Sequence, residues 1–547
     1  VKGKLVIARY GASFRGAKQA VAAMYGAAGV LIYDDPVEDG CALGTVMPNG
    51  PYRPSDGIQR GSSLYIWNYV GDPLTPGWAA TEKAPRLPLD KAENLPQPGT
   101  AMMAPLGYGD VSSMLANLGG PQAPASWQGG LGLASCTSLP GVTPVPVYRV
   151  GPGPVKVHMQ VHNENAIKPI KNWTVTIPGS KYPDQMVILG GHRDGWAYGT
   201  SDSISGAIPV MEMARGFSEL LKQGWQPERT IVLAGWDAEE PALLGSTEWV
   251  EDYAQRLGKS AVAFVNMDNA GGGVRFGASA IPALDDFIYE AAKEVTEPRN
   301  GLSLYDDWVQ RSQGNPRPRI GRLGGGSDYQ PFLDHVGVAS MSFGFSGTSG
   351  SYHSAYDDLW RMNLYGDPGY LHHATAAQIA GVLAMRLANA DLLPFRYSQY
   401  AASVVSNLDR LSQLQVQLYG QVMVSFDREK AQAEAWGKAA ADLEAKVDAL
   451  IAANPSVSPK LAGEFAFINE KLIRQERNLT QAKGLPGRPW YRHMIYSTGI
   501  LSGYTVETLP ALEDMITAGD WAKVRNYAAL LHNSLVTATN GAATAAK

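Results

Sequence analysis

Residues 190–207 read GGHRDGWAYGTSDSISGA and place one imidazole and two carboxylates, in His192, Asp194 and Asp202, within eleven positions. They directly follow the apolar run 186–189, which is typical of a buried strand. Other residues that can bind a metal or a proton follow the later apolar runs in the same way: Asp237, Glu239, Glu240, Asp268 and His353. Because the carboxyl ends of parallel strands meet at one edge of a sheet, we expect these side chains to converge.

Two imidazoles and several carboxylates at one place match what a pair of divalent cations requires. A carboxylate can bridge two cations, and imidazoles supply the nitrogen ligands that zinc favours. Taken singly, a strand-terminal Asp is more often a helix N-cap, and Glu239–Glu240 would more often begin a solvated helix. Their joint occurrence at successive strand ends favours the metal site.

The elements that must position these residues fall into three zones. Residues 1–160 are rich in Gly and Pro with short apolar runs, which predicts a small β-rich module. Residues 161–395 alternate apolar strands with helical patterns, which predicts an α/β fold with a mostly parallel sheet buried between helices. In residues 396–547 the helical period dominates, with apolar stripes at 443–451 and 521–535, which predicts an all-α region.

Composition limits the classes of partner and compartment. The net charge of −5 over 547 residues gives no basic surface for nucleic acid. The longest apolar stretch, 21–33, is shorter than the roughly 20 residues of a transmembrane segment. The chain opens on a strand-like segment without an initiator Met, so we expect a fragment or a processed form. Cys41 and Cys136 could form one disulfide or none, while Asn172 and Asn478 begin N-glycosylation acceptor patterns.

The order of the candidate ligands resembles that of the di-zinc peptidases of family M28. The stretches VILGGHRDGWAYG, WDAEEPALLGSTEW, RPWYRHMIY and GDPLTPG are similar to the branch of glutamate carboxypeptidase II and the transferrin receptor. The resemblance implies a protease-associated (PA) domain over 1–160 and a zinc-peptidase domain, of the phosphorylase/hydrolase-like fold, over 161–395. It also implies a helical dimerisation domain over 396–547, and a first peptidase segment that would lie upstream of this chain.

The resemblance also assigns roles around two zinc ions. Asp202 would bridge the ions, with His192 and Asp268 completing one site and Glu240 and His353 the other. In the same pattern, Asp194 would hydrogen-bond His192, and Glu239 would be the general base. Tyr352 could stabilise the oxyanion that forms at the scissile carbonyl.

Substrate selection departs from that of relatives that release C-terminal glutamate. Arg15, Tyr352 and Tyr504 match the residues that hold the substrate α-carboxylate there. Ser62 and Gly503 stand where those relatives use an Asn and a Lys for the glutamate side chain, and Ser327 replaces an Asn. Since no cation would compensate a buried glutamate side chain, the sequence predicts a carboxypeptidase that prefers a neutral terminal residue.

The resemblance implies three further properties. A calcium ion would be held by backbone oxygens of Thr75 and Trp78 and by the carboxylates of Glu248 and Glu251. The helical tail would form a homodimer. The protein would be extracytoplasmic, as a secreted, periplasmic or membrane-anchored glycoprotein.

Three alternatives remain open at this stage. An aminopeptidase of the same family would need an acidic anchor for the substrate amine. A receptor-like binding protein, as in the transferrin-receptor members, would lack the metal ligands. A glutaminyl-cyclase-like enzyme would use a single zinc ion and lack the flanking domains.

Overall fold

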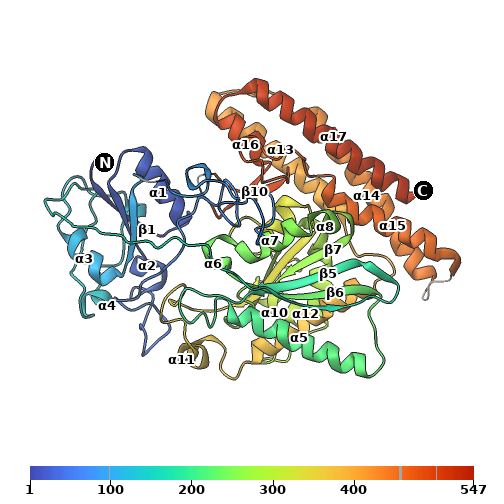
Figure 1. The fold of residues 1–547 in the computed structure, drawn as a ribbon, viewed down its shortest axis with the longest axis horizontal. Coiled ribbons are helices and arrows are strands. Elements are labelled where there is room, and N and C mark those ends of the chain that lie inside the picture. The colour runs from blue at the N-terminus through green and yellow to red at the C-terminus, as the bar shows by residue number, and fades with distance from the viewer. Residues whose placement is uncertain (98, 455–458, 501) are drawn as a thin grey trace.

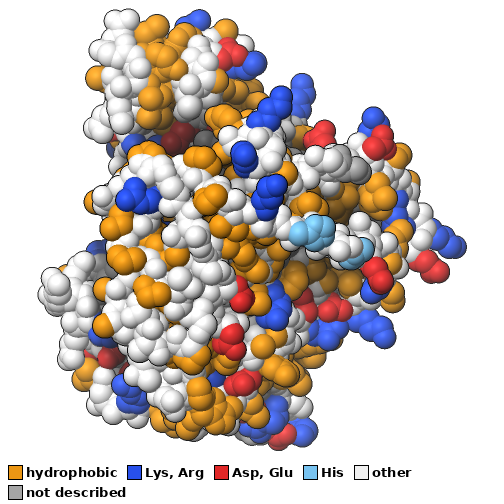
Figure 2. All heavy atoms as spheres, turned by 90° about the vertical axis from the view of Figure 1, so that its left-hand side faces the viewer, with side chains coloured by type: hydrophobic (Ala, Val, Ile, Leu, Met, Phe, Trp, Pro, Cys, Tyr) orange, Lys and Arg blue, Asp and Glu red, His pale blue; other side chains and the backbone are white. Residues whose placement is uncertain are grey.

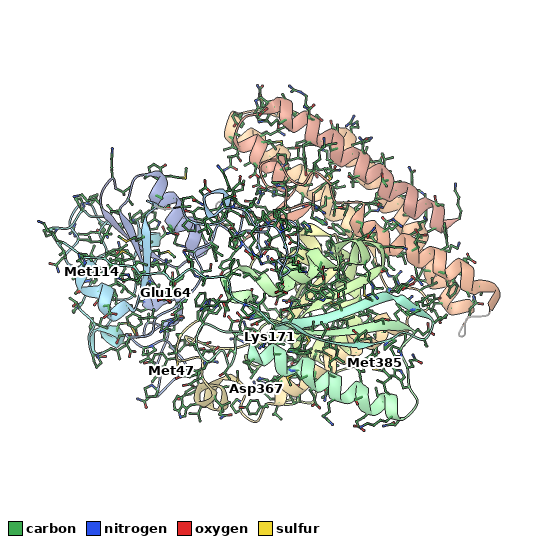
Figure 3. All side chains as sticks on the ribbon, viewed as in Figure 1. Met47, Met114, Glu164, Lys171, Asp367 and Met385 are labelled. Atoms are coloured by element: carbon green, nitrogen blue, oxygen red, sulfur yellow. A yellow bond between two sulfur atoms is a disulfide. The ribbon has the colours of Figure 1, made fainter. Side chains whose placement is uncertain are left out.

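The computed structural model describes residues 1–97, 99–454, 459–500 and 502–547. Figure 1 shows an N-terminal region at the left, a central sheet with its helices, and a helical region that ends the chain at the right. The segment between the N-terminal region and the sheet passes Glu164 and Lys171 (Figure 3). Among the described residues, every helix is either too short or too polar to span a lipid bilayer.

The central sheet has six strands in the order β4-β6-β5-β7-β9-β8. Its strands are β4 (Trp173–Ile177), β5 (Tyr182–His192), β6 (Arg229–Trp236), β7 (Ala261–Asn266), β8 (Arg275–Ala280) and β9 (Ser340–Ser346). The neighbours β6, β5, β7 and β9 pair in parallel, while the edge strands β4 and β8 are antiparallel. The predicted α/β fold with a mostly parallel sheet is therefore confirmed.

Helices cover both faces of this sheet, as its doubly apolar strands require. Val187 and Leu189 of β5 pack into the core on one face, whereas Met186 and Ile188 pack into a separate core on the other. In Figure 1, α5 and α12 lie below the sheet and α7 and α8 above it. The helices of this region are α5 (Ile204–Lys222), α6 (Glu239–Ala242), α7 (Leu244–Asp252), α8 (Ala254–Ser260), α9 (Asp285–Lys293), α10 (Leu304–Arg311), α11 (Leu359–Arg361) and α12 (Leu371–Asn389).

The parallel register brings the chemically interesting strand ends together. His192, the last residue of β5, pairs with Trp236, the last residue of β6. On the other side of β5, Gly190 pairs with Asn266, and Asp268 follows two residues later. Each strand therefore delivers its polar end to the same edge.

The N-terminal region contains a small parallel sheet of order β1-β2-β3 with short helices around it. Its elements are β1 (Leu5–Arg9), α1 (Arg15–Met24), β2 (Gly29–Tyr33), α2 (Pro36–Asp39), β3 (Met102–Leu106), α3 (Tyr108–Ala116) and α4 (Ala134–Thr137). It has less strand than predicted, because most of the Gly- and Pro-rich stretch 40–100 is irregular. Cys41 and Cys136 form a disulfide, which settles the open question of their pairing. On the face in Figure 2, Lys and Arg are interspersed with Asp and Glu.

The C-terminal region is helical, as predicted, with one short hairpin. Its elements are α13 (Tyr397–Tyr419), α14 (Asp427–Ala453), α15 (Pro459–Arg477), β10 (Tyr496–Thr498), β11 (Val506–Thr508), α16 (Pro510–Thr517) and α17 (Trp521–Ala546). The stripe on α17 is buried through Val524, Leu531 and Leu535. The stripe on α14 is shorter than predicted, because Ile451 is 49% exposed.

Candidate metal centre and adjoining pocket

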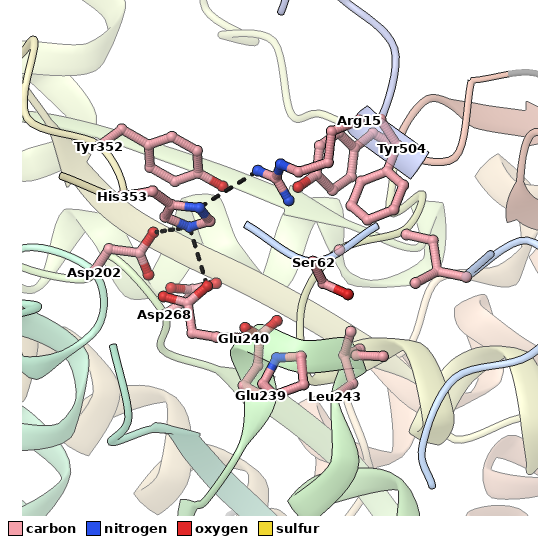
Figure 4. Close-up of a pocket in the computed structure, with 15 residues that line it drawn as sticks. Arg15, Ser62, Asp202, Glu239, Glu240, Leu243, Asp268, Tyr352, His353 and Tyr504 are labelled. Atoms are coloured by element: carbon pink, nitrogen blue, oxygen red, sulfur yellow. Dashed lines mark hydrogen bonds and ion pairs between the residues drawn. The ribbon is translucent and has the colours of Figure 1, made fainter. Parts of the chain in front are cut away.

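Asp202 lies between the two imidazoles of the cluster that the strand ends form, and Figure 4 shows it beside His353. Its Oδ1 is 3.2 Å from His192 Nε2, and its Oδ2 is 3.2 Å from His353 Nε2. Asp268 Oδ1 lies 3.1 Å from His192 Nε2, and Glu240 Oε2 lies 3.1 Å from His353 Nε2. The structure therefore brings together all five predicted ligands, as two triplets that share one carboxylate.

Backbone carbonyls fix the orientation of both imidazoles. His192 Nδ1 lies 3.0 Å from the carbonyl oxygen of Asp194, and His353 Nδ1 lies 3.0 Å from that of Arg60. A carbonyl only accepts, so each Nδ1 carries a hydrogen, and in its neutral form each imidazole therefore has its Nε2 lone pair on the side of the carboxylates. Arg15 Nη2 is 3.4 Å from the same His353 nitrogen, but a protonated Nδ1 cannot accept from it. The carbonyl of Arg60 is therefore the hydrogen-bond partner of His353 Nδ1.

This donor set fits metal cations. Lone pairs and carboxylate oxygens facing one another repel unless a positive charge lies between them. Ligand atoms of His192, Asp202 and Glu240 lie within 4.8 Å of one another, and this trio draws on both triplets. The buried Oε1 of Glu240 has no hydrogen-bond partner in the part of the chain that the structure describes. Two imidazole nitrogens with carboxylate oxygens are ligands that suit zinc.

The electrostatics of the cluster also favour added positive charge. Burial alone would lower the pKa of His192, but Glu239 and Asp268 outweigh it and hold that pKa well above its usual value. Burial raises the pKa of Glu239 well above that of a free glutamate, although His192 partly opposes the rise. The site therefore attracts protons, and a divalent cation would satisfy the same field.

Asp194 has a structural role that the sequence did not reveal. Its carboxylate accepts hydrogen bonds from the backbone N–H groups of Glu239 at 3.0 Å and Glu240 at 3.2 Å, which fixes the start of α6. The carboxylate is 3.6 Å from His192 Nδ1, farther than the 3.0 Å of its own carbonyl oxygen. Here the backbone of Asp194 holds His192, because the side chain is engaged by α6.

Asp357 holds the loop of the bridging carboxylate. It accepts hydrogen bonds from the backbone N–H groups of Ser201 and Asp202, each at 3.0 Å. Arg361 Nη1 adds a bond of 2.7 Å to the Ser201 hydroxyl. Sequence reasoning missed Asp357, although it belongs to the same stretch, YHSAYDD, as His353.

Ser327 lies behind the metal centre, in contrast to its predicted place in the substrate pocket. Its hydroxyl donates to Asp268 Oδ2 at 2.7 Å and accepts from Asn266 Nδ2 at 2.9 Å. These two bonds orient Asp268 toward His192. Asp237, another strand-end carboxylate, lies outside the cluster and accepts from Arg193 Nη2 at 2.9 Å.

A pocket adjoins the cluster, and its lining includes several of the predicted substrate residues (Figure 4). Beyond the metal-site residues its wall is mainly uncharged: Phe14, Ser62, Ile66, Pro241, Ala242, Leu243, Gly326, Tyr352 and Tyr504. Among the described residues that line the pocket, Arg15 is the one Lys or Arg.

Arg15 is held as a buried cation among aromatic rings. It is 3% exposed, and its Cζ lies 5.1 Å from the ring centre of Phe14 and 6.0 Å from that of Tyr504. A Cβ atom on Gly61 would lie 2.2 Å from Arg15 Cζ, so only Gly lets the guanidinium approach this backbone. No carboxylate within the described residues forms an ion pair with Arg15, and its buried Nε has no partner.

Tyr352 and Tyr504, the two tyrosines of the pocket, pack against different residues. The Tyr352 ring stacks on His353 with centroids 3.7 Å apart, and its outer face leaves the residue 39% exposed. Desolvation of the phenol, with Tyr504 and Asp202 nearby, raises the pKa of Tyr352 well above the usual value. Tyr504 packs edge-on against Phe14 at 4.9 Å. In contrast to its predicted role, Gly503 is not among the residues that line the pocket. It packs against Phe14 instead: its φ is +72°, and a Cβ there would lie 2.5 Å from Phe14 Cβ.

Comparisons with known proteins agree with this arrangement. Residues 172–374 match the profile of Peptidase family M28, residues 1–66 the PA domain, and residues 424–541 the transferrin receptor-like dimerisation domain. "Probable glutamate carboxypeptidase LAMP1" of Arabidopsis thaliana is 34% identical across 93% of this chain and 71% of its own length. This chain belongs to peptidase family M28, in the branch of glutamate carboxypeptidase II and the transferrin receptor.

Two further relatives of this M28 peptidase are named for different activities, one as an aminopeptidase and one as a glutamate carboxypeptidase. "Aminopeptidase NAALADL1" of Mus musculus is 32% identical, across 99% of this chain and 74% of its own length. "Probable glutamate carboxypeptidase" of Arthroderma benhamiae is 33% identical, across 98% of this chain and 73% of its own length. The family supports peptide-bond hydrolysis, while the names divide over which end of the substrate is cleaved.

A second acidic cluster lies between the PA-domain side and α7 of the M28 domain. Glu248 accepts from the backbone N–H of Asp72 at 2.7 Å, and from the Thr75 hydroxyl at 3.4 Å. Burial raises the pKa of Glu248 to about 7 and that of Glu251 to about 8. The buried Oε2 of Glu251 has no hydrogen-bond partner among the described residues. Two buried carboxylates that form no ion pair with any described residue fit the chemistry of a calcium site.

Asn172 contributes to packing beside this part of the M28 domain. Its Oδ1 accepts from the N–H of Asp237 at 2.9 Å, and its Nδ2 donates to the carbonyl of Gly245 at 2.7 Å. Since Nδ2 is the atom that a glycan would need, this structure does not present the sequon of Asn172 for glycosylation.

The position of Asp194 yields a test of metal binding. We expect Asp194→Asn to lower zinc affinity about 10- to 100-fold, because an amide NH₂ in place of one oxygen would face an N–H of α6. Titration of the metal-free protein against a competing chelator measures this. The matched control is Asp237→Asn, at a strand-end carboxylate outside the cluster, which should bind as the wild type does. Equal affinities for the two variants would contradict the assignment.

Proposed function

We propose that this protein is a di-zinc exopeptidase. One ion would be held by His192, Asp202 and Asp268, and the other by Asp202, Glu240 and His353. The observation that carries the proposal is the position of Asp202, whose two oxygens each face a different imidazole at 3.2 Å. A receptor-like binding protein would not require these buried metal ligands, and a single-zinc enzyme would require only one of the two triplets.

When bound, two zinc ions lower the pKa of a water molecule and polarise the scissile carbonyl. Glu239 accepts the proton of that water and delivers it to the leaving amine. Its Oε2 is 3.8 Å from His192 Nε2, so it lies beside the first triplet without belonging to it. The hydroxyl of Tyr352, which its raised pKa keeps protonated, would donate to the oxyanion as it forms.

Arg15 supports a carboxypeptidase. A buried guanidinium that lacks a carboxylate partner is satisfied by the terminal carboxylate of a peptide, which two of its N–H groups can hold together. Ser62, Ile66 and Leu243 would surround the side chain of the released residue. Their uncharged atoms favour a neutral terminal residue over glutamate.

Aminopeptidase activity is the second candidate, favoured by the name of the NAALADL1 relative. Such an enzyme must bind a protonated amine beside the metal centre. A buried guanidinium in the same pocket would repel that amine. For this reason we place carboxypeptidase first.

The remaining parts of the proposal concern assembly and compartment. The match to a dimerisation domain supports a homodimer. Thr75, Trp78, Glu248 and Glu251 would hold one calcium ion between the two N-terminal domains. The Cys41–Cys136 disulfide supports an extracytoplasmic, oxidising compartment.

Replacing the general base tests the mechanism. We expect Glu239→Gln to lower kcat at least about 1,000-fold, because the amide cannot accept the proton of the attacking water. Zinc content should remain at the wild-type value, since Glu239 lies outside both ligand triplets. Elemental analysis and single-turnover kinetics on the same preparation provide both readouts. Near-normal turnover would refute the assignment of Glu239.

A panel of matched dipeptides tests the specificity. Substrates with a blocked amino terminus and a free C-terminal Leu, Met or Ala should be cleaved faster than the same peptide ending in Glu. Substrates with an amidated C-terminus should be poor. Arg15→Met should lower kcat/KM at least about 30-fold, because a buried partner of the carboxylate is lost.

The reverse preference, for a free amino terminus with a tolerated C-terminal amide, would establish the aminopeptidase. Ser62→Lys is the companion variant, and it should improve release of C-terminal Glu by placing a cation in the pocket wall.

A further inference from the structure

The loop that carries His353 is bound along its length by a segment of the PA domain. The N–H of Gly350 donates to the carbonyl of Pro51 at 2.9 Å. The N–H of Arg60 donates to the carbonyl of His353 at 2.9 Å, and His353 Nδ1 donates back to the carbonyl of Arg60 at 3.0 Å. Thus a proposed metal ligand of the M28 domain takes its backbone and ring partners from another domain.

Arg53 lies at the centre of this contact and is completely buried. Its Nε donates to Asp39 Oδ2 at 2.8 Å and lies 3.3 Å from Asp34 Oδ2. Its Nη2 is 2.8 Å from the same Asp39 oxygen and also donates to the backbone carbonyl of Tyr352 at 3.1 Å. The two carboxylates neutralise the guanidinium, and one of its N–H groups is directed at the loop.

The orientation of the Tyr352 carbonyl determines the backbone conformation of His353. This carbonyl belongs to the peptide plane that precedes His353, and rotation of that plane sets the φ angle of His353. That φ is +54°, in the left-handed region that non-glycine residues rarely adopt. A conformation of this kind costs on the order of 1–3 kcal/mol and persists only when its surroundings fix it. The bond from Arg53 fixes this plane.

Gly350 shows how closely the two domains meet. A Cβ atom there would lie 2.0 Å from the backbone nitrogen of Arg53 and 2.5 Å from the carbonyl oxygen of Asp39. The N–H of Arg53 in turn donates to that carbonyl at 2.8 Å. The segment that carries Arg53 therefore has little freedom relative to the loop.

We propose that Arg53, braced by Asp34 and Asp39, is a positioning residue that sets His353 in its ligand conformation. The inference rests on the proposed di-zinc function, and it concerns one half of the metal centre. Without Arg53 the peptide plane before His353 can rotate, and the imidazole of His353 then no longer points into the proposed site of Asp202, Glu240 and His353. The half formed by His192 and Asp268 keeps its own supports.

The test compares zinc binding by three variants of the full chain. Arg53→Met removes the guanidinium at similar volume, while Arg53→Lys keeps a charge beside Asp39 but lacks the second donor that reaches Tyr352. Arg9→Met is the matched control: Arg9 lies in the same domain, 4.0 Å from the buried carboxylate of Asp35, and donates to Gln128 rather than to the loop. Calorimetric titration of the metal-free proteins with zinc separates the two binding steps, and kcat, KM and thermal midpoints are measured alongside.

In the wild type and in Arg9→Met we expect two zinc ions with similar affinities. In Arg53→Met the weaker step should lose at least about tenfold in affinity while the tighter step stays within about twofold, and kcat should fall at least tenfold with KM little changed. For Arg53→Lys, the affinity of the weaker zinc step and kcat should lie between those of the wild type and those of Arg53→Met. If Arg53→Met does not fold, the same loss of one step in Arg53→Lys decides the question.

Two unchanged zinc sites with wild-type kcat in the Arg53 variants would overturn the inference, even if their thermal midpoints fall. An equal loss at both steps would overturn it as well, because general destabilisation would then be the cause. A wild-type chain that binds no zinc would refute the proposed function itself, which is a separate result.

Discussion

The structure depends on the repulsion among acidic side chains that are gathered in one buried space. Asp202, Glu239 and Asp268 lie within 4 Å of His192 Nε2, and Asp202 and Glu240 lie within 4 Å of His353 Nε2. Burial makes this arrangement costly, since water no longer screens the charges. Two divalent cations would remove that cost, and the proposed peptidase chemistry depends on them.

Hydrogen bonds from several elements of the fold hold these acidic side chains in place against their repulsion. The parallel order of β6, β5 and β7 brings the strand ends to one edge. Backbone groups then orient each side chain: Asp194 caps α6, Asp357 binds the loop of Asp202, and the carbonyl of Arg60 holds His353. Because Arg15 and Arg60 come from the PA domain, neither the pocket nor the metal centre belongs to the M28 domain alone.

Much of this could be predicted from the sequence because it depends on local patterns. Apolar runs followed by acidic residues identified the parallel strands and their functional edge. The uses of Asp194, Ser327 and Asp357 could not be predicted, because a short polar side chain gives no sign of which distant N–H or oxygen it will meet. The same holds for Arg53, whose partner is a backbone carbonyl 299 positions away. Periodicity overestimated strand content in the N-terminal zone, where Gly and Pro favour irregular backbone.

Anomalous diffraction at the zinc absorption edge, from crystals grown with zinc, tests the central claim most directly. The account predicts two peaks about 3.5–4 Å apart, one on either side of Asp202, the first beside His192 and the second beside His353. A single peak, or imidazoles of His192 and His353 that point to different regions, would contradict it.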